Sequence, residues 1–305
     1  MIFRNDFLIT NRFAPLMGLT LAYVLGDNLL HKTAVKVGEI ISKRPDSRIM
    51  TSLRSNIAMI KGVDQDHPEV KKLSRQAIIN AAIGNADLFS AIVKGKNRIL
   101  DLCEMDPELI YRINLAKRNQ KGKILIGPHT LGFEMFMLWF GLKQSPVFAL
   151  TYSNPSGSYI THNILRSRYG LDLSPISTNS LKAAYKKLKK GKTILTAVDR
   201  TNGKGIDLNF FKKTVRIPSG PFTIAYKTQT KILLGFSKKT SQNKYRVQYG
   251  GCFEPDYTGN TSEDIKNLAQ KVITKIENFI RKYPEQWMMF HKVSENNSQK
   301  QEKIS

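Results

Sequence analysis

From Lys123 onward, short apolar runs alternate with longer amphipathic stretches. The runs have the length and composition of strands, and the stretches between them repeat apolar residues at helical spacing. The predicted strands are "KILIG", "PVFALTY", "TILTAV", "KILLGFS" and "YRVQYGGCF". The predicted helices are "LGFEMFMLWFGLK", "SYITHNILRSRYG", "SLKAAYKKLKKG" and "PFTIAYKTQT". This alternation predicts an α/β fold, with a mixed central sheet flanked by helices.

The first third of the chain has a helical pattern instead. Pro68 is placed to begin a helix that continues through "EVKKLSRQAIINAAIGNADLFSAIV". The sequence Asp106-Pro107-Glu108 begins another, which Gly122 ends. Near the other terminus, "EDIKNLAQKVITKIENFIRKY" carries one apolar face. The fold therefore includes a helical N-terminal region.

The segment 13–30, "FAPLMGLTLAYVLGDNLL", is apolar but short. Its uncharged part ends at Gly26, and a membrane span needs about 20 residues. A small-residue cleavage site is missing, which disfavours a signal peptide. A helix at the membrane interface or docked on the protein is one interpretation, and a core helix is another. The basic residues that flank the segment are Arg4, Arg12, Lys32 and Lys36.

These patterns divide the chain into three parts. Residues 1–45 form a membrane-associating or docked helical region, and residues 46–293 form the main domain. The end of the chain, residues 294–305, is a polar tail that we expect to be disordered.

Charge narrows the possible partners. The 305 residues include 48 Lys and Arg against 24 Asp and Glu, a net charge of +24. Such a surface attracts nucleic acid or anionic lipid headgroups, although it can also be merely solvated. We disfavour nucleic acid, because the sequence contains no recognised binding motif. The two cysteines, Cys103 and Cys252, have no ligand-like spacing and predict neither a disulfide framework nor a zinc site.

Two ionisable residues, His129 and Glu134, interrupt the apolar stretch "KILIGPHTLGFEMFMLWFG". Five positions along one helix turn a side chain by about 140°, so the spacing does not suit a pair of metal ligands. A histidine at a strand end can be structural. However, His129 follows a strand where open α/β sheets present their sites, and Glu134 lies near the start of the next helix.

A histidine and a carboxylate that meet in this way suit acyl transfer. The imidazole accepts the proton of an acceptor hydroxyl, and the carboxylate fixes the imidazole tautomer. No protein nucleophile is expected, because the chain has no Gly-x-Ser-x-Gly motif and neither cysteine has a His or Asp nearby in sequence. The acceptor oxygen would attack directly.

The segment "GPHTLGFE" resembles the His-x4-acid motif of the lysophospholipid acyltransferase superfamily. Its Glu version is similar to the lipid A lauroyl/myristoyl acyltransferase branch. Three further segments resemble that branch in the same order: "SLRSNIAMI", "KLKKGKTILTAVDR" and "YPEQWMMFHK". The resemblance spans Ser52 to Lys292.

The resemblance implies an acyltransferase-like fold and a membrane-associated O-acyltransferase of lipid A and lipopolysaccharide biosynthesis. The donor would be a thioester of acyl carrier protein or coenzyme A, and the acceptor a hydroxyl of a lipid A precursor or related glycolipid. It also implies catalysis without cofactor or metal. The enzyme would lie against an anionic membrane surface, on the cytoplasmic face of the bacterial inner membrane, held peripherally or by one N-terminal anchor.

The same resemblance assigns residues. His129 would be the catalytic base and Glu134 its partner. For substrate binding it implies Arg168, in preference to Arg166, which we expect on a basic helix face. Asp199 matches the Asp of the family's Pro-Asp-Gln segment, in which Arg200 replaces Gln. Both Asp199 and Arg200 are therefore predicted to bind substrate.

Two alternatives stay open from the sequence. A phospholipid or phosphatidylinositol-mannoside acyltransferase would use the same His-x4-Glu pair. A non-enzymatic nucleic-acid binder would account for the net charge alone. The acceptor, the acyl chain length and the choice between carrier protein and coenzyme A are not determined by the residues.

Overall fold

The computed structural model describes residues 13–144, 146–155, 157–201 and 205–293 of the chain. Arg4, Arg12, Lys204 and the expected tail 294–305 lie outside the described residues. The helices before the sheet are α2 (Ala14–Val24), α3 (Asp27–Ser42), α4 (Arg48–Lys61), α5 (Pro68–Lys94) and α6 (Lys96–Leu102). The later helices are α7 (Pro107–Arg118), α8 (Phe133–Gln144), α9 (Ser158–Ser167), α10 (Thr178–Lys189), α11 (Gly220–Thr228), α12 (Thr261–Lys282) and the 3-10 turn η1 (Pro284–Gln286).

The centre of the molecule is a seven-stranded sheet in the order β1-β9-β8-β2-β5-β3-β4. Its strands are β1 (Cys103–Met105), β2 (Lys123–Ile126), β3 (Val147–Thr151), β4 (Leu171–Pro175), β5 (Thr193–Thr196), β8 (Ile232–Lys239) and β9 (Tyr245–Phe253). Neighbours are parallel except for β8 and β9, which are antiparallel. The predicted α/β fold with a mixed sheet and a helical N-terminal region is confirmed.

The sequence analysis missed β1, β4 and the hairpin of β6 (Ile206–Phe210) and β7 (Lys213–Ile217). The hairpin turns at Phe211 and Lys212, whose φ angles of 52° and 61° are positive. Tight hairpin turns usually place Gly or Asn at such positions, so the usual sequence signal is absent. The edge strand β4 buries only Leu171 fully, which leaves no apolar run to detect.

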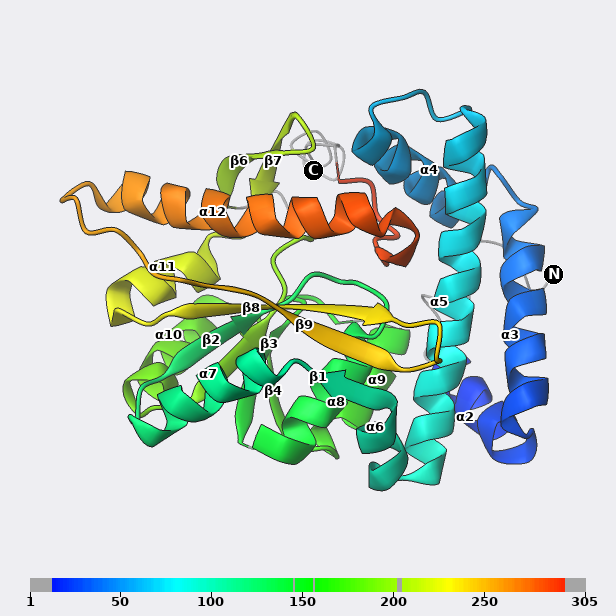
Figure 1. Cartoon of the computed structure of the whole chain (residues 1–305), viewed down its shortest axis with the longest axis horizontal. Helices are drawn as coiled ribbons and strands as arrows, with labels where there is room; N and C mark the ends of the chain where they lie inside the picture. The colour runs from blue at the N-terminus through cyan, green and yellow to red at the C-terminus, as the bar shows by residue number, and fades with distance from the viewer. Residues whose placement is uncertain (1–12, 145, 156, 202–204, 294–305) are drawn as a thin grey trace, which may run out of the picture.

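Alternate residues of each central strand face opposite layers of helices, as the two-residue period of a strand requires. Ile124 and Ile126 belong to the cluster that includes α10, α11 and α12, whereas Leu125 belongs to the cluster with α7 and α8. Figure 1 shows α12 crossing one face of the sheet, with α7 and α8 on the other side.

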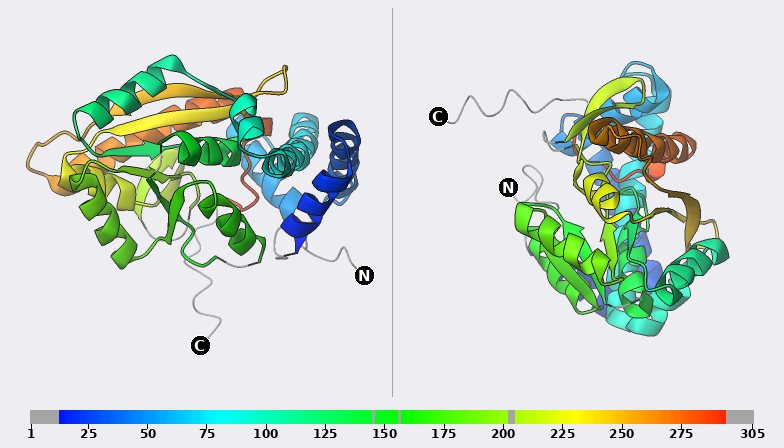
Figure 2. Two further views of the ribbon diagram at one scale, coloured as in Figure 1. Left: turned by 90° about the horizontal axis from the view of Figure 1, so that it is seen from below. Right: turned by 90° about the vertical axis from the view of Figure 1, so that its left-hand side faces the viewer.

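The N-terminal helices stand beside the sheet rather than over it. Both α2 and α3 pack against α5, and all three lie together at one end of the molecule (Figure 2). The contact between α3 and α5 is close, because a Cβ on Gly38 would lie 2.7 Å from the Cα of Ile79. The segment 13–30 thus contains α2 and the start of α3, and both helices pack on α5.

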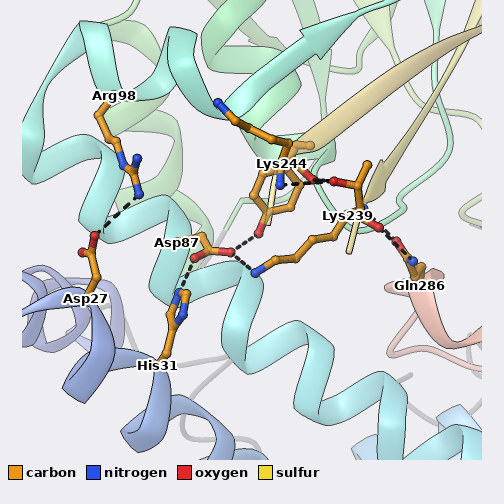
Figure 3. A network of polar contacts seen from close by, with 9 residues as sticks. Asp27, His31, Asp87, Arg98, Lys239, Lys244 and Gln286 are labelled. Atoms are coloured by element: carbon orange, nitrogen blue, oxygen red, sulfur yellow. Dashed lines mark hydrogen bonds and ion pairs between the residues drawn. The ribbon is translucent and has the colours of Figure 1, made fainter. Parts of the chain in front are cut away.

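A polar network connects α3 and α5 to the sheet (Figure 3). The buried carboxylate of Asp87 on α5 contacts Nε2 of His31 on α3. It also accepts hydrogen bonds of 2.5 Å from Nζ of Lys239 on β8 and from the hydroxyl of Tyr245 on β9. Burial and the Asp87 carboxylate raise the pKa of Tyr245, which keeps that hydroxyl a donor.

One described helix, α5, is long and apolar enough to cross a membrane by length and composition. Over half of its most apolar window is buried in protein, against α2, α3 and α4 among others. The shorter α2 has 11 residues and buries Pro15 and Ala22. Its other face is exposed and apolar: Phe13, Leu16, Met17, Leu21 and Val24.

Candidate active site

His129 and Asp199 meet because of the sheet register. Ile126 at the end of β2 is paired with Thr196 at the end of the parallel neighbour β5. Each of the two residues comes three positions after its strand, so both emerge side by side at the carboxyl edge. This edge is where open α/β sheets bind their ligands.

Asp199 holds the imidazole and the backbone of His129 together. Its Oδ1 lies 2.7 Å from Nδ1 of His129, and its Oδ2 accepts a 2.8 Å hydrogen bond from the His129 backbone N–H. The indole N–H of Trp287 donates a third hydrogen bond to Oδ2, also at 2.8 Å. Burial alone would raise the pKa of Asp199, but His129 and Trp287 hold this pKa below its usual value. Asp199 is therefore a carboxylate, fully buried at 0% exposure.

The closing segment of the domain fixes the loop that carries His129. Met288 donates its backbone N–H to the carbonyl of His129 at 2.7 Å, and Leu131 donates to the carbonyl of Gln286 at 2.7 Å. The side chain of Asn56 on α4 in turn donates to the carbonyls of Met289 and His291. The segments "SLRSNIAMI" and "YPEQWMMFHK" thus meet in space and support the histidine.

Glu134 makes a different contact from the one expected. We expected its carboxylate to fix the His129 tautomer, but Asp199 occupies Nδ1, and Glu134 pairs with Arg166 of α9. Arg166 donates from Nε to Oε2 at 2.8 Å and also contacts Oε1 through Nη2. Burial opposes both charges, yet the pairing lowers the pKa of Glu134 and raises that of Arg166. Glu134 nonetheless lines the same cavity as His129.

The burial of Arg166 and Arg168 differs from what we expected. Arg168, which we preferred, is exposed at the end of α9. Arg166, which we expected on a basic surface, is 5% exposed and lines the cavity with His129. The helix pattern shows the reason, because Leu165 and Arg166 lie on the buried side of α9.

Arg200 lines the same cavity as His129. Its guanidinium carbon is 4.1 Å from the ring centroid of Tyr152, a cation–π distance. Its Nη2 donates to Nε2 of His291 at 2.9 Å. Burial, then the positive charges of Arg200 and Arg48, lower the pKa of His291 to about 4, so this imidazole is a neutral acceptor.

Two cavities adjoin His129. The His129 cavity has a volume of about 140 Å³, and the apolar cavity, of about 270 Å³, extends from it towards α5. Residues of both include His129, Phe133, Glu134, Tyr159 and Arg166. The apolar cavity adds the side chains Leu88, Leu131, Met135, Met288 and Phe290.

This arrangement can accept and return a proton. Nδ1 of His129 is held by a carboxylate, which leaves Nε2 as the nitrogen that can take a proton from a ligand. Within the part of the chain that the structure describes, His, Cys, Asp and Glu nowhere gather in a group of three that could hold a metal ion. Both described cysteines are free, and burial raises the pKa of Cys103 to about 12, so its thiol is not a ready nucleophile.

Comparison with known proteins adds the family. None of the curated proteins compared with the chain matches it. The sequence model of the bacterial lipid A biosynthesis acyltransferases matches residues 1–293, which is nearly the whole chain and includes every site residue described above. The chain therefore belongs to the bacterial lipid A biosynthesis acyltransferase family.

Proposed function

We propose that this enzyme moves a fatty acyl chain from a thioester of acyl carrier protein or coenzyme A to a hydroxyl of a lipid A precursor. The observation that carries the mechanism is the 2.7 Å contact between Nδ1 of His129 and the buried carboxylate of Asp199. A base held in this way has one tautomer, and its Nε2 is available at the cavity.

The reaction needs His129 twice. Nε2 removes the proton of the acceptor hydroxyl while the oxygen attacks the thioester carbonyl carbon. The new carbon–oxygen bond forms a tetrahedral oxyanion, whose collapse breaks the carbon–sulfur bond. The departing thiolate takes the proton back from the imidazolium, so the products are an ester and a free thiol. Asp199 stabilises the imidazolium between these two transfers.

Glu134 and Arg166 are positioning residues in this proposal. Their ion pair joins the first turn of α8 to α9, on the wall that the two cavities share. Arg166 also lies 5.0 Å from the ring centroid of Tyr159, which lines both cavities. Fixing these elements keeps the space beside His129 open for the thioester, and the apolar cavity receives the first part of the acyl chain.

We also propose that the exposed face of α2 rests on the membrane. It adjoins α9, which contacts α2 and exposes Ile160 and Ile164. An apolar helix face at the headgroup level binds peripherally, and the net charge of +24 adds attraction to anionic lipid. The thioester donors are made in the cytoplasm, so this surface would lie against the cytoplasmic face of the inner membrane.

The experiment that tests the reaction uses purified enzyme, lipid A precursor and an acyl thioester of either carrier, with products identified by mass spectrometry. We expect one added acyl chain with wild type and none with a folded His129→Ala variant. His31→Gln is the matched control, because it alters a second histidine–carboxylate contact at a residue that lines neither cavity. Normal turnover by His129→Ala would exclude the mechanism, and acylation of phospholipid alone would exclude the acceptor.

The membrane proposal has its own test. Leu16→Glu/Met17→Glu should reduce sedimentation with vesicles of anionic phospholipid. The control is Tyr111→Glu/Leu115→Glu, which adds the same two charges at exposed apolar positions of α7. Equal binding of wild type and the α2 variant would contradict this surface.

A further inference from the structure

A third and larger cavity opens beside the His129 cavity. Its volume is about 870 Å³, and we call it the basic cavity. Tyr152, Ser153, Ile176, Arg200 and Pro218 line both spaces, so a molecule in the basic cavity can place another part of itself at His129. This volume is in the range of pockets that hold small organic ligands.

The charged side chains among the described residues that line the basic cavity are all positive. Its lining includes Arg48 at the start of α4, Arg200 after β5, and Lys292 in the closing segment. Among the described residues that line it, there is no Asp or Glu. A neutral or cationic group would gain nothing from such a wall, whereas an anion is attracted by all three side chains.

Arg200 is prepared for an anion before any ligand arrives. Tyr152 stacks on one side of its guanidinium, and His291 accepts one of its N–H groups. A planar guanidinium held in this way retains further N–H donors, and it loses less rotamer freedom on binding. His291 adds no charge of its own at neutral pH, because its pKa is lowered to about 4.

Hydroxyl groups and helix starts complete the lining. Thr51, Ser52, Ser177, Thr178 and Ser219 line the cavity and lie in or next to the first turns of α4, α10 and α11. The Thr51 hydroxyl already donates to the carbonyl of Ser47 at 3.0 Å. The other hydroxyl groups and the positive ends of the helix dipoles add to the attraction of the three cations.

We propose that the basic cavity binds a phosphate group of one of the two substrates and thereby orients that substrate at His129. A phosphate has several oxygens and up to two negative charges, which matches several converging cations and hydroxyl donors. The basic cavity is much larger than a phosphate alone, so we expect the phosphate to be part of a larger substrate molecule. The inference rests on the proposed acyl transfer, and its ligand chemistry can come from the acceptor or from the donor.

The test compares two charge-matched double variants in acyl transfer. Arg48→Gln/Lys292→Gln removes one Arg and one Lys from the basic cavity. Lys117→Gln/Arg118→Gln removes the same two residue types from the exposed end of α7, at the opposite edge of the sheet. We expect the first pair to raise a substrate KM about tenfold or more with kcat little changed, and the second pair to leave both at wild-type values.

Substrate chemistry then identifies the source of the phosphate. The acceptor is supplied before and after phosphatase treatment, and the donor as acyl-coenzyme A or as acyl-pantetheine, which lacks phosphate. If the acceptor supplies it, the KM effect of Arg48→Gln/Lys292→Gln disappears with the dephosphorylated acceptor. If the donor supplies it, the effect disappears with acyl-pantetheine. The proposal is overturned if Arg48→Gln/Lys292→Gln leaves KM unchanged. It is also overturned if the rise in KM is the same with and without phosphate on both substrates.

A binding measurement separates this proposal from the reaction itself. Inorganic pyrophosphate should raise the Tm of wild type and of the α7 variant, because a ligand that binds only the folded state stabilises it. Arg48→Gln/Lys292→Gln should lose that rise. If wild type transfers no acyl chain but shows this difference, the proposed function fails and the anion site stands. If all three proteins respond equally, the site is refuted even where acyl transfer is observed.

Discussion

Two histidine–carboxylate contacts in this molecule have the same chemistry and different surroundings. In one, Asp199 holds His129 at the carboxyl edge of the sheet, beside a cavity. In the other, Asp87 contacts His31 where α3 packs on α5 (Figure 3). The further contacts of Asp199 are neutral donors, the Trp287 indole and a backbone N–H. Those of Asp87 include the cation of Lys239.

The two contacts differ in which group balances the negative charge of the aspartate. The ammonium of Lys239 already balances the negative charge of Asp87. At Asp199 the imidazole of His129 is the contacting group that can carry a positive charge, because the other contacts are an indole N–H and a backbone N–H. In the proposed mechanism His129 is the catalytic histidine, since its carboxylate contacts neutral donors otherwise and its ring borders a cavity.

The largest effect is expected from breaking the first contact. Asp199→Asn should lower kcat about 100-fold or more, because the imidazolium loses its carboxylate and the tautomer is no longer fixed. His129→Ala should cost at least as much. The measurement is acyl transfer by variants whose circular dichroism and Tm show a folded protein. Asp199→Asn with wild-type kcat would remove this aspartate from the mechanism.

Breaking the second contact should affect stability instead. Asp87→Asn leaves the nearly buried ammonium of Lys239 without its carboxylate, and we expect a loss of about 3 kcal/mol in the free energy of unfolding. Asp46→Asn, at an exposed position, is the control for loss of one charge. Urea denaturation measures the change. If Asp87→Asn lowers kcat per folded molecule as strongly as Asp199→Asn does, the distinction between the two contacts is not valid.

His291 extends the comparison, because its ring contacts a cation, Arg200, rather than a carboxylate. Its pKa is lowered from 6.5 to about 4 in the folded protein. The unfolded chain therefore takes up a proton that the folded protein rejects, and stability falls as the pH decreases from about 6.5 to about 4. His291→Asn should reduce the change of the urea unfolding midpoint with pH between about 6.5 and about 4. If the urea midpoint of the variant depends on pH as that of wild type does, groups other than His291 cause the loss of stability.

The smallest effect is expected from His31→Gln. Lys239 and Tyr245 still satisfy Asp87, so the loss should be about 1 kcal/mol, the value of one hydrogen bond, with kcat unchanged. Urea denaturation and acyl transfer on the same preparation provide both values. A kcat loss comparable to that of His129→Ala would mean that the α3–α5 contact is coupled to the site.

The sequence by itself determined much of this protein. Alternating apolar runs and amphipathic stretches predicted the mixed α/β sheet, because both periods are local properties of the chain. His129 was a site candidate because it follows the strand "KILIG" and Pro128, and Asp199 was one because it matches the Asp of the family's Pro-Asp-Gln segment. The ordered set of segments also pointed to the family that the comparison shows.

Only the tertiary structure decided which residues meet. The sequence places Glu134 five positions from His129 and Asp199 seventy positions away, which favoured Glu134 as the partner. In the sheet, β5 lies next to β2 in parallel register, and equal offsets after the two strands bring Asp199 to the imidazole. Strand order depends on packing between distant segments, and local pattern does not encode it. For the same reason the burial of Arg166 against Glu134, and the indole of Trp287 on Asp199, became visible only in the folded chain.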